Sequence, residues 1–265
     1  MSAGISSKPV FMAVALLLSA LTLVACGSGG GSGGTSRSTA EGYWSGTQVS
    51  GQNTVAMFGA VLEDGSLWVT YSINAEVIGI FNGTGTSVSG NFSAPNSFEF
   101  PIKGTPIPAS LSGPYVPQTS FVINGVEPSE PPPNNFSFSL VYDSSYDLSL
   151  SSSQMLASIA GNWAAPFVDS DKILNFVVAS DGRFSATGNG VGCQLTGAFS
   201  PRASGRNVYD FSGTFGGSPC PAAAVGRVFK GIAQPIRNAA GTATRLLVQS
   251  VDSTKTLPLA LTVSR

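Results

Sequence analysis

The sequence predicts an all-β protein made of two tandem antiparallel β-barrel or β-sandwich domains. Three observations lead to this fold class: a hairpin signal in each half of the chain, strands with alternating apolar and polar residues, and an internal duplication. The 265 residues are enough for two domains that each bury a core. The chain has 32 glycines, 17 prolines and only 10% charged residues, against roughly 25% in an average domain, which favours strands and turns over solvated helices.

An apolar segment lies near the start of the chain. Residues 10–24 form an almost unbroken apolar run after Lys8. This run is shorter than the ~20 residues of a membrane-spanning helix but has the length of a signal-peptide core. It ends in Leu-Val-Ala-Cys at residues 23–26, which resembles the lipobox of bacterial lipoproteins. The resemblance implies that residues 1–25 are a signal peptide and that Cys26 is lipidated; an ordinary secretory peptide or a signal anchor is the alternative.

Residues 26–38 are expected to be the lipidated cysteine and a tether. The sequence from Gly27 to Ser38 is GSGGGSGGTSRS, which has no apolar side chain to bury and predicts a flexible coil with a reach near ~20 Å. Two or three acyl chains on Cys26 would give stable membrane attachment. Glycine after the lipid cysteine implies the outer membrane, by the sorting rule of enteric lipoproteins. Whether the protein faces the periplasm or the exterior stays open.

The rest of the chain contains an internal duplication. Gly42-Tyr43-Trp44 matches Gly161-Asn162-Trp163, and Asp64-Gly65 matches Asp181-Gly182. Two more matches follow in the same order, namely Gly79-Ile80-Phe81 with Gly197-Ala198-Phe199 and Ser89-Gly90-Asn91-Phe92 with Ser212-Gly213-Thr214-Phe215. We therefore predict two homologous β domains, at residues 39–150 and 151–265.

Each domain is expected to be an antiparallel sheet. The two Asp-Gly pairs are strong hairpin signals and predict flanking strands at 55–62, 66–71, 173–179 and 183–187. Alternation of apolar and polar residues, as in 136–142, indicates a sheet with one buried face. The further strands predicted are 76–81, 87–92, 120–123, 136–142, 194–199, 209–215, 227–233, 244–251 and 257–263.

Two features interrupt the predicted strands. A short helix is expected at residues 153–160, with Ser152 or Ser153 as its N-cap and Gly161 as its stop. Residues 95–117 and 126–135 contain several prolines, and we expect them to be long irregular insertions in the first domain.

A short helix followed by Gly-x-Trp and a meander resembles the calycin group, the lipocalins and avidin-like barrels. In those barrels the tryptophan plugs one end of the core, which implies that role for Trp44 and Trp163. Surface lipoproteins of pathogenic bacteria that bind transferrin or complement factor H are similar in their Gly/Ser-rich tether and eight-stranded barrels. The side chains expected to line a ligand cavity are Trp44, Trp68, Tyr71, Phe81 and Trp163; the alternative is that they are plain core.

Cys193 and Cys220 remain after the lipid cysteine is set aside. Beyond the inner membrane the environment is oxidising, so these two cysteines are predicted to form a structural disulfide in the second domain. Chain entropy predicts about 3–4 kcal/mol of stabilisation for a loop of this length. A redox or metal-binding pair would need a C-x-x-C spacing or histidine partners, and the sequence has neither.

Charge is divided unevenly between the two domains. Residues 39–150 hold nine acidic residues and one lysine, whereas residues 151–265 hold ten basic and five acidic residues. Either the basic domain faces an anionic partner such as lipopolysaccharide, or the two domains dock against each other, or the asymmetry has no role. The acidic pairs Glu63/Asp64 and Glu127/Glu130 are expected to be solvated, and Asp169-Ser170-Asp171 is expected to be a surface turn and not a Ca²⁺ loop.

These observations favour binding over catalysis. The chain has no histidine, which removes histidine-based triads and histidine metal sites, and no catalytic residue, metal or cofactor is predicted. The balanced overall charge argues against nucleic-acid binding. We expect a lipoprotein that binds a small apolar ligand or a protein partner. The alternative is a structural envelope component that packs with other outer-membrane proteins, and an enzyme such as a hydrolase ranks last.

Overall fold

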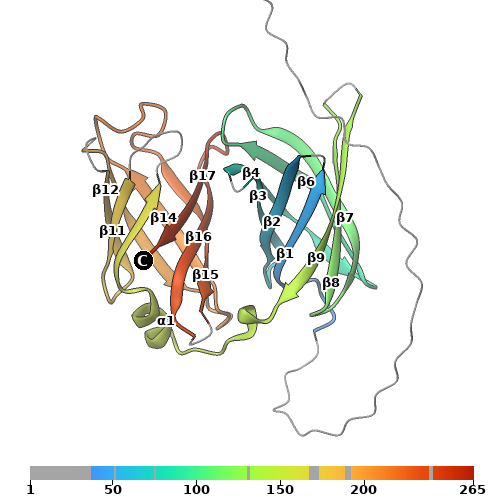
Figure 1. Ribbon diagram of the computed structural model, residues 1–265, viewed down its shortest axis with the longest axis horizontal. Helices are drawn as coiled ribbons and strands as arrows, with labels where there is room; N and C mark the ends of the chain where they lie inside the picture. The colour runs from blue at the N-terminus through green and yellow to red at the C-terminus, as the bar shows by residue number, and fades with distance from the viewer. Residues whose placement is uncertain are drawn as a thin grey trace, which may run out of the picture.

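The computed structural model describes residues 37–265 except 51, 75, 130–131, 167–172, 189–191 and 239–240. Within this part of the chain two antiparallel sheets each close into a barrel, and the barrels lie side by side (Figure 1). The predicted all-β tandem architecture is confirmed, in its barrel form. No helix of the described residues is long and apolar enough to cross a membrane.

The first barrel is a meander with one extra hairpin strand. Strands β1–β4 and β6–β9 form the ring, which the pairings β1–β9 and β4–β6 close, and β5 pairs with the start of β6. The strands are β1 (Gly42–Ser50), β2 (Asn53–Val61), β3 (Ser66–Ile73), β4 (Glu76–Thr84), β5 (Thr86–Val88), β6 (Asn91–Pro101), β7 (Ile107–Val116), β8 (Ser120–Glu127) and β9 (Asn134–Asp143).

A linker leads from the first barrel to a regular eight-stranded meander. It contains the 3-10 helix η1 (Ser144–Asp147) and the helix α1 (Ser152–Ile159), whose N-cap is Ser151 in a capping box with Gln154. The ring closes through the pairing β10–β17. Its strands are β10 (Gly161–Pro166), β11 (Ile173–Val178), β12 (Arg183–Gly188), β13 (Gln194–Pro201), β14 (Tyr209–Phe215), β15 (Val228–Arg237), β16 (Ala243–Asp252) and β17 (Pro258–Ser264).

The two predicted Asp-Gly hairpins are built in the same way. Gly65 and Gly182 have φ angles of 80° and 86°, in the left-handed region that favours glycine. Asp64 accepts the backbone N–H of Ser66 at 2.9 Å, and Asp181 accepts that of Arg183 at 3.0 Å. The Gly-x-Trp motifs start β1 and β10, the Asp-Gly turns join the next two strands, and Phe81 on β4 matches Phe199 on β13, so three of the four duplicated motifs have equivalent positions. The fourth match fails, because Phe92 lies near the start of β6 whereas Phe215 ends β14, the equivalent strand.

Two predictions for the first barrel are wrong. Residues 95–117 are not an irregular insertion, since they include most of β6 and all of β7. Pro95 is accommodated because the β6–β7 register shifts between Ala94 and Ser97, which leaves it outside the regular ladder. The predicted strand at 87–92 is instead the tight hairpin between β5 and β6, with Gly90 at φ 77°.

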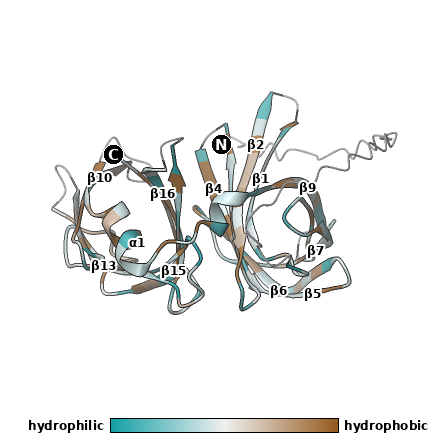
Figure 2. Cartoon of the chain, turned by 90° about the horizontal axis from the view of Figure 1, so that it is seen from below, coloured by the Kyte–Doolittle hydropathy of each residue, from teal (hydrophilic) through white to brown (hydrophobic). Residues whose placement is uncertain are grey.

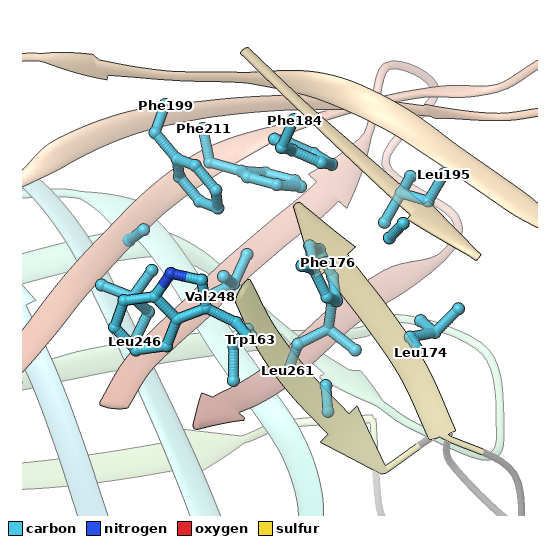
Figure 3. Close-up of a cluster of buried hydrophobic side chains, with 14 of the residues drawn as sticks. Trp163, Leu174, Phe176, Phe184, Leu195, Phe199, Phe211, Leu246, Val248 and Leu261 are labelled. Carbon is cyan, nitrogen blue, oxygen red and sulfur yellow. The ribbon is translucent and has the colours of Figure 1, made fainter. Parts of the chain in front are cut away.

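Each barrel has its own apolar core. The first contains Trp44, Phe81, Phe92 and Phe121 among others, and aliphatic side chains fill the spaces between the rings. In the second, Phe184, Phe199 and Phe211 gather around one side of the interior while Trp163 and Phe176 face them (Figure 3). The ring pairs lie 4.9–5.7 Å apart between centroids. Aromatic packing of this kind adds to the stabilisation from burial alone.

The outer faces of the barrels are buried against each other (Figure 2). Strands β3 and β4 contact β16 and β17, and an apolar cluster joins Tyr43, Ala60 and Leu62 to Val208 and Ile232. Every residue from Leu246 to Asp252 in β16 is buried, which requires cover on both sides of that strand. The Gln249 amide also donates to the Phe58 carbonyl at 3.0 Å. We call this contact the seam.

Ion pairs cross the seam as well. One guanidinium nitrogen of Arg202 lies 2.8 Å from Glu63 and 3.1 Å from Asp64 of the first barrel, and another lies 2.6 Å from Asp210. The sequence suggested that Glu63 and Asp64 are simply solvated, but the structure places both in ion pairs with Arg202. Three charge-assisted hydrogen bonds from the Arg202 guanidinium to Glu63 and Asp64 cross the seam and help to fix the relative position of the barrels. Among the alternatives for the charge asymmetry, these contacts support docking of the two domains.

Candidate functional site

Tryptophan fills the same end of both barrels. The Trp44 indole donates to the Ala40 carbonyl at 2.8 Å, and the Trp163 indole donates to the Ile159 carbonyl at 2.7 Å, each four residues upstream. Trp44 also makes edge-on contacts with Phe121 and Tyr142, at 5.5 and 5.3 Å between centroids. β1 and β10 both start here, so we call this the tryptophan end. Both residues lie in the apolar cores of their barrels.

The opposite end of the first barrel contains two buried acidic residues. Glu99 near the end of β6 is 7% exposed, and Glu127 at the end of β8 is 4% exposed. The Tyr71 hydroxyl donates to Glu99, and the Asn134 amide donates to Glu127 at 2.7 Å. We call this end of the molecule, which these four residues mark in the first barrel, the polar end. Buried carboxylates are costly unless they are bonded, so their presence here needs a reason.

Aromatic rings surround these polar groups. Tyr71 lies 5.3 Å from Phe81, and Phe81 lies 5.1 Å from Phe136. Tyr71 and Phe136 are only partly buried against the core, so part of each ring remains at the surface of the barrel end. Two glycines allow this packing: a Cβ at Gly79 would lie 2.6 Å from the Tyr71 ring and one at Gly125 would lie 1.9 Å from Phe136.

The Tyr71 hydroxyl remains a donor over the whole physiological pH range. Burial raises the pKa of Tyr71, and the nearby Glu99 and Glu127 carboxylates raise it further. The protonated Tyr71 hydroxyl donates its hydrogen bond to the Glu99 carboxyl group. The two carboxylates therefore offer acceptor atoms, and a ligand group that binds them must be a hydrogen-bond donor or a cation.

The five predicted lining residues separate into three groups. Trp44 and Phe81 are in the interior of the first barrel, with Tyr71 partly buried against the same core. Trp163 lies in the separate core of the second barrel. Trp68 does not face either interior: it is on the outside of β3 and packs in the seam cluster. The structure thus brings only Tyr71 and Phe81 to the polar end.

Sequence reasoning missed the acidic members of the polar end. Glu127 was expected to be solvated, but it points inward because it continues the alternation of Phe121, Ile123 and Gly125 along β8. That alternation was the signal that could have found it. Glu99 comes after the register shift in β6, so the alternation of side chains before the shift does not predict which way Glu99 points. Glu130, Asp169, Asp171 and the predicted lipid site Cys26 lie outside the described residues.

The corresponding end of the second barrel is covered. Cys193 and Cys220 form the predicted disulfide, with a Cα–Cα distance of 4.5 Å. Cys220 and Ala224 belong to the core cluster, and Phe215 pairs with Val225 in an isolated bridge. The disulfide therefore holds the segment after β14 over the barrel interior. Among the described residues of the chain, no group of three or more Cys, Asp or Glu side chains is arranged to hold a metal ion.

Comparisons with known proteins add little to this geometry. No family model and no curated protein matches the chain. Among solved structures the chain is similar to a "putative outer membrane protein" from Bacteroides fragilis NCTC 9343, with 11% sequence identity, covering 85% of this chain and 95% of that one. The TM-score is 0.24.

Proposed function

We propose that this chain is a lipid-anchored binding protein of the bacterial outer membrane, held through Cys26, and that the polar end of the first barrel is its binding site. The observation that supports this site is the combination of partly exposed rings, Tyr71 and Phe136, with the buried carboxylates of Glu99 and Glu127. Small-molecule sites commonly join an apolar wall to a few convergent polar groups. The activity proposed is binding and not catalysis.

The chemistry of the polar end favours a small apolar ligand that carries a positive charge. An aromatic or aliphatic body would pack on the rings of Tyr71, Phe81 and Phe136. A protonated amine would meet the acceptor oxygens of Glu99 and Glu127 and the negative faces of the rings. The described residues of the second barrel differ, because the buried carboxylate at its matching end, Asp252, is bonded by Arg227, Thr254 and Thr256, and the disulfide-linked segment covers that end.

A fluorescence titration tests this site with defined probes. We expect 2-naphthylmethylamine to bind the full-length protein at least tenfold more tightly than 2-naphthylacetate, which has a similar ring and the opposite charge. Glu99→Gln or Glu127→Gln should each weaken amine binding at least tenfold, which is about 1.4 kcal/mol. Glu76→Gln is the matched control, since Glu76 is an exposed acidic residue at the same end of the barrel.

Two results would contradict the proposed site. One is equal affinity for the amine and the carboxylate probes. The other is amine binding that all three glutamine variants retain. Circular dichroism of each variant distinguishes loss of the site from loss of the fold, since the antiparallel sheet signal must persist.

A second candidate is a structural protein that associates with other envelope proteins. The observation that favours it is the outer face of β11, where Ile173 and Val177 are 43% and 56% exposed on a strand outside the seam. Exposed apolar side chains on one strand face suit a protein contact. If this role is the principal one, Ile173→Ser with Val177→Ser should release the lipoprotein from a larger native complex on a sizing column, and an unchanged elution position would contradict it.

A further inference from the structure

The first described residue of the chain is fixed to the tryptophan end. Arg37 forms an ion pair with Asp147 of η1, donates to the Glu41 carbonyl at 3.0 Å and lies 5.0 Å above the Tyr146 ring. Its side chain is only 9% exposed. Arg206 of the second barrel completes the group, 3.3 Å from both Glu41 and Asp147. We call these five residues the clasp.

The clasp fixes the end of the barrels at which the chain that follows Cys26 begins to be described. Only ten residues separate Cys26 from Arg37, and a fully extended chain of that length spans at most about 40 Å. For a Gly/Ser-rich sequence the typical span is roughly half of that limit. A ten-residue strand such as β9 spans about 33 Å. Measured from the clasp, the polar end is farther than the tryptophan end by about one strand length, which exceeds the typical span of these ten residues.

We propose that the tryptophan ends of both barrels form a membrane-facing surface that contacts the lipid headgroups around the Cys26 acyl chains. This inference rests on the proposed lipid anchor. The clasp lies beside the seam and includes a residue from each barrel as well as the linker. Because α1, which leads into β10, lies at the same end of the molecule as the start of β1 (Figure 1), one attachment point orients both barrels together.

The first barrel presents apolar side chains at this end. Val88, Val116, Val141 and Leu148 are 66%, 55%, 65% and 40% exposed, and all lie where strands or η1 end on the tryptophan side. Val116 and Val141 both pair with Ser120, so they flank it on adjacent strands. Side chains of this kind gain free energy in the headgroup region, where apolar surface leaves water.

The second barrel presents arginines at the same end. Arg183 starts β12 and is 83% exposed, with Asp181 3.5 Å away, and Arg245 near the start of β16 is also exposed. Guanidinium groups bind phosphate oxygens well. Several acidic residues at this end are already bonded: Asp64 pairs with Arg202, Asp147 pairs with Arg206, and Asp143 caps η1. A lipid surface with anionic phosphates fits this mixture of valines and arginines.

Headgroup quenching tests the orientation directly. The lipidated protein would carry a single added cysteine with an NBD label at Thr119 or Ser180 on the tryptophan end, or at Thr105 or Ser253 on the polar end; all four are exposed. It would be reconstituted on phosphatidylethanolamine/phosphatidylglycerol vesicles that contain a spin-labelled headgroup. We expect at least threefold stronger quenching at the tryptophan end. Equal quenching at both ends, or stronger quenching at the polar end, would overturn the inference.

Two variants separate the anchor from the orientation. Cys26→Ser should leave the protein in the supernatant; if it stays on the vesicles, the proposed lipid anchor fails. If Cys26→Ser is released but the native protein shows no difference between its ends, the orientation alone fails. Val116→Ser with Val141→Ser should lower quenching at Thr119 at least twofold, and unchanged quenching would overturn the proposed contact surface.

Discussion

Asn207 at the seam is the residue whose loss should most clearly separate the two barrels. Its side chain is buried, donates to the Ser145 carbonyl of the linker at 2.9 Å and accepts from Arg237 at 2.9 Å. Its backbone carbonyl accepts from the Tyr43 hydroxyl. Asn207→Ala removes both side-chain bonds and leaves the backbone contact in place.

The size of the effect follows from these two bonds. A neutral hydrogen bond contributes about 0.5–1.5 kcal/mol, and one to a charged group contributes about 1.5–3 kcal/mol. We therefore expect Asn207→Ala to lower the free energy of unfolding by about 2–4 kcal/mol. For a chain of this size that corresponds to a decrease of roughly 5–15 °C in melting temperature.

Urea denaturation followed by tryptophan fluorescence and circular dichroism is the assay. The native protein should unfold in one transition, because the seam couples the barrels, whereas Asn207→Ala should show two separated transitions. Asn124→Ala is the control: Asn124 accepts a bond from Ser137 on an exposed face, and its loss should change stability by less than about 0.5 kcal/mol. A cost below about 1 kcal/mol for Asn207→Ala, with one transition retained, would refute the reasoning.

Three further predictions concern stability. Replacing Cys193 and Cys220 by serine should cost about 3–4 kcal/mol in urea unfolding, and an unchanged midpoint would contradict the role of the disulfide. Burial opposes ionisation of Asp252, but bonds from the Thr254 hydroxyl, from backbone N–H groups and from Arg227 outweigh it and hold the pKa well below its usual range. The ionised Asp252 therefore stabilises the fold above about pH 4, and this stabilisation is lost as the pH falls through the lowered pKa. The difference in melting temperature between the native protein and Asp252→Asn should shrink in acid. A difference that stays constant with pH would argue against this. Burial raises the pKa of four tyrosines above about 10, so their contribution to folding stability is lost only in strong alkali. Absorbance at 295 nm should show that these four ionise only as the protein unfolds. Reversible titration of all six tyrosines near pH 10 would be inconsistent with the packing. The four are Tyr43, Tyr71, Tyr146 and Tyr209.

The parts of the fold that local rules determine were predictable. Asp64-Gly65 and Asp181-Gly182 define tight turns, since an aspartate acceptor and a left-handed glycine fix the geometry without help from distant residues. The strands around them follow from alternation. The stretch at 95–117 was mispredicted because a register shift places Pro95 where it breaks no ladder, and only the partner strand shows that.

The candidate site was predictable only in part. Tyr71 and Phe81 reach it by alternation along β3 and β4, and Glu127 follows the same rule along β8. Trp68 could not line the same interior as Tyr71, because residues three apart in a strand face opposite sides. Its place in the seam, like the pairing of Arg202 with Glu63, depends on residues from the other barrel that no local pattern brings together.

Hydrogen–deuterium exchange of the full-length lipoprotein, with and without 2-naphthylmethylamine, tests the proposed binding site most directly. We expect the ligand to slow exchange in the parts of β3, β6 and β8 that carry Tyr71, Glu99 and Glu127, and to leave exchange in the second barrel unchanged. Slower exchange confined to the second barrel or the seam, or no change at a saturating concentration, would contradict it.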